Sequence, residues 1–152
     1  MRTYKRELKT ILLHLRGCAW AKHGNVQNVI VEYTHLDNAA KTPTGARRVS
    51  LQIFHAARAI DTLLAHIANH EGTKCGRQVP QYWTLGSSLR AIQLHGVGGL
   101  RFSGPTETDI GDMTDSRNTY LHQANCFPND QDMQVFINKT IRAILEAAVF
   151  PP

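Results

Sequence analysis

Apolar residues recur along most of the chain at intervals of three and four, which is the spacing of one face of an α-helix. The longest uninterrupted stripe begins at Val49 and ends at Ile67. The pattern predicts helices over about residues 8–22, 26–36, 49–67, 106–124 and 130–149. Since no internal repeat or second composition regime divides them, we predict an all-α fold: an antiparallel four- to five-helix bundle in a single domain, 1–152.

Residues that stop or start helices agree with these limits. Gly72 follows the longest stripe, Pro105 precedes the helix at 106–124, and Asn129 is placed to cap the last helix. Between about residues 72 and 104 the periodicity weakens and glycines accumulate. We interpret this stretch as a loop-rich insertion in the bundle.

The size and composition favour one core. The chain has 152 residues and a mass of 17.0 kDa. No apolar run is long enough to span a membrane, and the first residues lack the apolar core of a signal peptide, so we expect a cytoplasmic protein. Cys18, Cys75 and Cys126 form no disulfide pattern and are expected to be reduced.

The charge is positive and unevenly distributed. The net charge is +5 and the pI is about 9.4, which favours a polyanionic partner. Residues 1–22 are basic, whereas 107–115 carry four acids and no base. Solvated helix faces give the same pattern, so charge alone does not identify a nucleic-acid-binding protein.

The stretch from Asp115 to His122 combines residue types that support acid–base chemistry and phosphate binding. Asp115, Asn118 and His122 are spaced i, i+3 and i+7 and therefore share one helix face. Arg117 lies on an otherwise apolar stripe and points about 140° away from His122 on a regular helix. We expect the long arginine side chain to reach round towards the histidine, so that the group flanks a groove.

This stretch resembles the R-x4-6-H signature of the HEPN-domain family. Arg117 matches the arginine, Asn118 the polar residue that often follows it, and His122 the histidine. The motif is followed by Asn125-Cys126-Phe127-Pro128-Asn129, similar to the short loop that follows it in that family. The likeness is specific only from about Asp115 to Asn129.

The resemblance implies a metal-independent endoribonuclease that works as a homodimer without a cofactor. Cleavage by 2′-OH attack would leave a 2′,3′-cyclic phosphate and a 5′-OH, with His122 moving a proton, Arg117 binding the phosphorane and Asn118 orienting groups. A role as a toxin or anti-phage defence effector follows from the same likeness. The remaining candidates are accessory residues Asp115 and Tyr120, and RNA-binding residues Lys5, Arg6 and Lys9.

One departure from the family concerns control. Some HEPN toxins carry a tyrosine two residues after the histidine that a partner nucleotidyltransferase modifies, and this chain has Ala124 there. We expect no sensing domain on this bundle. Control by another chain is therefore expected, such as an antitoxin, a nucleotidyltransferase or a defence-complex partner.

Two other interpretations stay open at this point. A non-catalytic HEPN-like module for nucleotide binding or protein interaction would use Arg117 as a salt bridge to Asp112 or Asp115 and His122 as a helix-end residue. A metal-binding bundle would use pairs at i, i+4. Those pairs are His14 with Cys18 and His66 with His70.

Overall fold

The computed structural model describes residues 26–43, 45–74, 102–123 and 126–148, with Arg6 and Thr10, and the side chains of these except at 26, 66–74 and 148. These residues form four helices and no strand: α2 (Val26–Ala40), α3 (Ala46–Lys74), α5 (Gly104–His122) and α6 (Asp130–Ala148). The prediction of a small all-α bundle is confirmed in this part of the chain.

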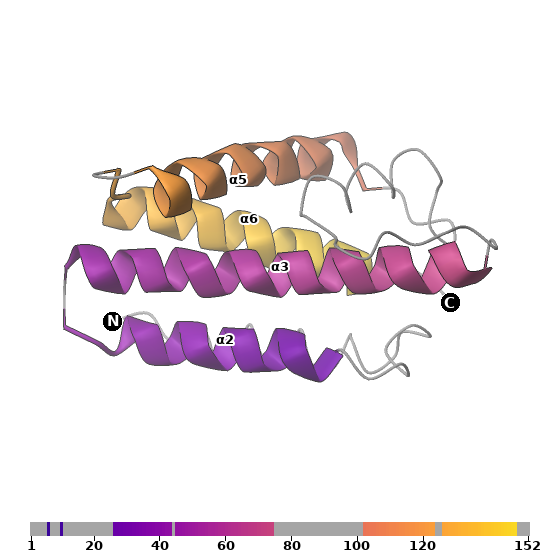
Figure 1. Cartoon of the computed structure of the whole chain (residues 1–152), viewed down its shortest axis with the longest axis horizontal. Helices are drawn as coiled ribbons and strands as arrows, with labels where there is room; N and C mark the ends of the chain where they lie inside the picture. The colour runs from indigo at the N-terminus through magenta and orange to yellow at the C-terminus, as the bar shows by residue number, and fades with distance from the viewer. Residues whose placement is uncertain are drawn as a thin grey trace.

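The helices run up and down beside one another (Figure 1). α2 and α3 are joined at one end of the bundle, and α5 and α6 are joined at that same end, so each pair is antiparallel. α3, the longest, packs against all three of the others, while α5 also packs on α6. A change on α3 can therefore affect every other described helix.

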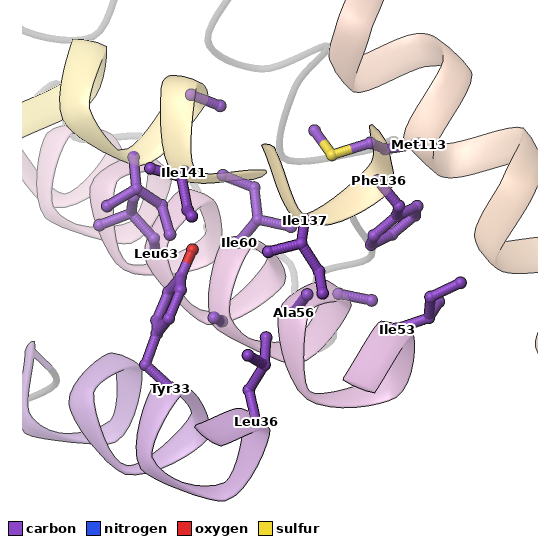
Figure 2. Packing of buried hydrophobic residues seen from close by; sticks show 14 of the residues in the cluster. Tyr33, Leu36, Ile53, Ala56, Ile60, Leu63, Met113, Phe136, Ile137 and Ile141 are labelled. Carbon is purple, nitrogen blue, oxygen red and sulfur yellow. The ribbon is translucent and has the colours of Figure 1, made fainter. Parts of the chain in front are cut away.

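The core lies around the inner face of α3. Ile53, Ile60 and Leu63 of α3 are fully buried, as the periodicity predicts for one helical stripe. Figure 2 shows Tyr33 pointing from α2 towards this stripe, where Ile141 of α6 also packs. Helices far apart in the sequence are thus held together by one continuous apolar cluster.

Three residues were predicted to mark helix ends: Asn129 does so, whereas Gly72 and Pro105 lie inside their helices. Asn129 caps α6 as predicted: its side-chain oxygen accepts the Asp132 N–H at 2.8 Å, and Asp132 Oδ2 accepts the Asn129 N–H at 3.3 Å. α3 continues through Gly72, since glycine weakens a helix without ending it. α5 begins at Gly104 and includes Pro105, because proline suits the first turn, where its missing N–H is not needed.

Two of the four acids of α5 pair with bases of α6 across the bundle. Asp112 accepts from Lys139 of α6 at 2.6 Å, and Asp109 accepts from Arg142 at 2.8 Å. The hydrogen bond to Asp112 is the main cause that raises the pKa of Lys139, and burial acts the other way. No helix among the described residues is both long and apolar enough to cross a membrane.

Several predictions lie outside the described residues. They include Lys5, Lys9, the His14 and Cys18 pair, and nearly all of the predicted insertion, since residues 75–101 are not described. Arg6 and Thr10 are both helical and exposed, and the Thr10 hydroxyl donates to the Arg6 carbonyl at 3.1 Å.

Candidate functional site

Arg117 belongs to the inner stripe of α5, one turn beyond the part that is fully buried. Ile110 and Met113 precede it on this stripe and are buried, so the backbone directs the Arg117 side chain towards α3. Its Nη2 lies 3.7 Å from Oδ2 of Asp61, and each of the two side chains is about a quarter exposed, 25% and 24%. This ion pair explains the arginine on an apolar stripe.

Asp61 is an unusual partner because burial opposes its charge. Burial raises the pKa of the Asp61 carboxyl, and the nearby Arg117 charge acts in the opposite direction. Its Oδ1 is buried and accepts no hydrogen bond from the described part of the chain. Arg117 therefore supplies the compensating charge for this carboxylate, and the pairing places the guanidinium next to α3.

Asn118 and His122 lie on the outer face of α5. Both are exposed, as is Asp115, so the predicted i, i+3, i+7 alignment is found on the solvent side. Arg117 Nη1 donates to Asn118 Oδ1 at 3.3 Å, which links the inner and outer faces. His122 is the last residue of α5 and is exposed at its carboxyl end.

The structure does not bring every candidate together. The described residues give neither His122 nor Asp115 a hydrogen bond, so the acid and the amide do not hold the imidazole here. The alternative prediction of a salt bridge from Arg117 to Asp112 or Asp115 is wrong in its partner. Asp61 takes that place, because Arg117 faces α3 whereas Asp112 is directed to α6.

Tyr120 lies on a different side of α5, facing α6. It packs against the core, and its pKa is raised by burial first and then by the Asp132 and Cys126 charges and a hydrogen bond with Asp132. It lines a pocket of about 160 Å³ between α5 and α6 that includes neither Arg117 nor His122. Tyr120 is therefore not grouped with the other candidates.

The described residues contain no group of three or more side chains arranged to hold a metal ion. The side chains of His66 and His70, the second predicted ligand pair, lie outside those residues. Cys126, whose reduced state was expected, is a free cysteine.

A second polar cluster lies between α2 and α3 and was not predicted. Buried Glu32 accepts from Arg58 Nε at 2.7 Å and lies 2.8 Å from His55 Nδ1. The ring of His35 stacks on that of His55 at 5.1 Å between centroids. Only the side-by-side placement of the two helices creates this cluster, so no local sequence pattern marks it.

Two features of the surface of α5 are relevant to chemistry. A guanidinium held by one carboxylate still has donors for a phosphate oxygen, and an exposed imidazole can accept or give a proton.

Comparison of the chain with models of protein families, with curated proteins and with solved structures finds no match. The residues of this chain that can carry out such chemistry are Arg117, Asn118 and His122.

Proposed function

We propose that this protein is a metal-independent endoribonuclease that cleaves RNA through Arg117 and His122, with Asn118 positioning the phosphate. The observation that supports this most is the 3.3 Å contact between Arg117 and Asn118, which brings the cation to the exposed stripe that ends at His122. The likeness of this stretch to the HEPN signature supports the same residues.

The proposed reaction requires one proton to be removed and another to be supplied. The 2′-oxygen bonds to the adjacent phosphorus, the bond from phosphorus to the 5′-oxygen breaks, and His122 accepts the 2′-OH proton. A second proton goes to the leaving 5′-oxygen; in a homodimer the partner's His122 supplies it. The products are a 2′,3′-cyclic phosphate and a 5′-OH.

The guanidinium would act on charge that develops during the reaction. The phosphorane carries more negative charge on its oxygens than the phosphodiester does, so fixed donors bind it more strongly. Asp61 limits the movement of Arg117, and a donor that is already oriented does not need to reorganise during the reaction. Asp61 is thus a positioning residue in this proposal.

The test uses RNA in which a single 2′-OH is removed. A labelled RNA is incubated with the protein and a metal chelator, and the cleaved bonds are mapped. The same RNA is then made with deoxyribose on the 5′ side of one of these bonds and is treated in the same way. We expect that bond alone to survive, because its nucleophile is missing, while the others yield cyclic phosphate ends. Cleavage of the deoxy-substituted bond at an unchanged rate would show that the 2′-OH is not the nucleophile.

The alternative is a non-catalytic module, with Arg117 serving as an interhelix ion pair. The pairing with Asp61 favours it, since structural ion pairs join helices in the same manner. It predicts that the wild-type protein leaves a range of RNAs intact. In that case Arg117→Ala would change stability or binding and no reaction rate.

A further inference from the structure

A row of basic and apolar side chains follows the exposed face of α3, and we call it the α3 track: Arg47, Leu51, Phe54 and Arg58. These positions are spaced by three or four residues, so they lie on one side of the helix. Arg47, Phe54 and Arg58 are exposed and Leu51 is half-buried. Arg58 pairs with Glu32 of α2, and Asp61, one turn further along α3, pairs with Arg117 of α5, so these two helices lie on either side of the track.

The α3 track is continuous with the candidate site on α5. Asp61, which pairs with Arg117, lies seven residues after Phe54. Seven residues are two helical turns, so the two side chains leave α3 on nearly the same side, about 10 Å apart along the axis. From Arg47 to Asp61 the helix rises by about 21 Å, the length of about six stacked nucleotides.

Arg58 contacts two neighbours, and its terminal amino groups stay exposed. Its Nε donates to Glu32, and its guanidinium lies over the Phe54 ring at 5.4 Å. The second oxygen of Glu32 faces His55 at 2.8 Å, so Arg58 is not the sole compensation for the buried carboxylate. Arg58 is 58% exposed, and its terminal amino groups form no hydrogen bond within the described chain.

The surface next to Arg58 is aromatic. Phe54 is 36% exposed, and its ring meets the ring of His55 edge-on at 5.3 Å. Single-stranded nucleic acids bind where cations contact the phosphates and flat side chains contact the bases. A basic and aromatic surface next to Arg117 meets both requirements.

We infer that the α3 track binds a single strand of RNA and leads it to the candidate site on α5. The terminal amino groups of Arg58 contact a phosphate, and the exposed part of Phe54 packs against a base. Arg47, which has no ion pair among the described residues, contacts a phosphate further along the strand. The inference rests on the proposed function, because it makes the track part of the RNA substrate site.

Binding is tested separately from cleavage. The probe is a fluorescein-labelled 12-nucleotide single strand made entirely of deoxynucleotides, which has no 2′-OH and is not cleaved by the proposed reaction. Its dissociation constant is measured by fluorescence anisotropy. We expect Arg58→Ala and Phe54→Ala each to weaken binding about tenfold. Arg47→Ala, which removes no internal contact, should weaken it less and reduce its dependence on salt.

Arg142→Ala is the matched control. Arg142 lies on α6, is 59% exposed and pairs with a carboxylate, as Arg58 does, but it is not on the track. It should bind the probe as the wild type does. Equal weakening by Arg142→Ala, or unchanged binding by both Phe54→Ala and Arg47→Ala, would overturn the inference. So would a change of oligomeric state in Phe54→Ala, since the face would then join two copies of the chain.

The outcomes also separate this inference from the proposed function. If the wild type cleaves RNA while the track variants bind normally, the inference is wrong and the cleavage proposal stands. If the wild type cleaves no RNA but its binding of the probe depends on Arg58 and Phe54, the cleavage proposal is wrong. That result would support the track as a surface for single-stranded nucleic acid.

Discussion

Asp61 is the residue at which stability and the proposed activity can be separated. Because burial raises the pKa of its carboxyl, the folded chain holds this proton more tightly than the unfolded chain does. The contribution of Asp61 to stability is therefore fully present below its ordinary pKa of 3.8 and is lost as the pH rises through the folded value. Above that folded value the cost of burying the ionised carboxylate exceeds the stabilisation that Arg117 provides.

Replacement of Asp61 by asparagine should therefore have opposite effects on stability and on cleavage. The free energy of unfolding of Asp61→Asn should equal or exceed that of the wild type at pH 7, and the difference should shrink in acid. RNA cleavage should fall by about 10- to 100-fold, because Arg117 is no longer held in position. Chemical denaturation at several pH values and single-turnover cleavage measure the two effects; loss of stability at pH 7 with unchanged cleavage would contradict the assignment.

The arginine could be noticed from the sequence, but its partner could not. Arg117 interrupts an apolar stripe, which is a local signal that its charge needs compensation. Asp61 lies on another helix, and which acid faces Arg117 depends on how α3 and α5 pack. The cluster of Glu32, His55 and Arg58 was missed for the same reason.

At the scale of the elements, the cap of α6 is a local feature that could be predicted from the sequence. Asn129→Ala removes the acceptor of the Asp132 N–H, so the free energy of unfolding should fall by about 1 kcal/mol. Asn138→Ala on the exposed face of the same helix is the control and should change it by less than about 0.5 kcal/mol. Thermal and urea denaturation measure both; equal effects would show that the cap contributes nothing specific.

The buried stripe of α6 gives a second test of the elements. Ile137 is fully buried, and its truncation in Ile137→Ala should lower the free energy of unfolding by about 2–5 kcal/mol, because a cavity remains. Val135 on the same helix is 47% exposed, and Val135→Ala should cost much less. Urea denaturation of both variants measures the difference, and similar losses would mean that the two positions are buried alike.

The helices could be predicted from hydrophobic periodicity alone, because a helix that buries one face must carry apolar residues at intervals of three and four. Four of the predicted helices match α2, α3, α5 and α6, and the largest difference is at the end of α3, predicted at about residue 67 and observed at Lys74. The two differences, at Gly72 and at Pro105, arise from residues that are unfavourable in the interior of a helix but are tolerated near its ends.

For the whole molecule, the proposal that the partner's His122 supplies the second proton predicts a dimer as the active form. Light scattering should give twice the 17.0 kDa of one chain, and cleavage per chain should fall on dilution below the dissociation constant of the dimer. Cleavage that stays constant per chain in a monomeric sample would show that one chain is sufficient.

If Arg117 and His122 carry out RNA cleavage as proposed, the rate at which cyclic phosphate ends form depends on both side chains. One labelled RNA is cleaved under single-turnover conditions, in the presence of chelator, by the wild type, Arg117→Ala, His122→Ala and the control Arg142→Ala. We predict that the cleavage rate falls by about 100-fold or more in each of the two site variants and stays within about twofold of the wild type in the control. The free energy of unfolding of His122→Ala should equal that of the wild type. Cyclic phosphate ends formed at the wild-type rate by either site variant would show that the replaced side chain takes no part in cleavage.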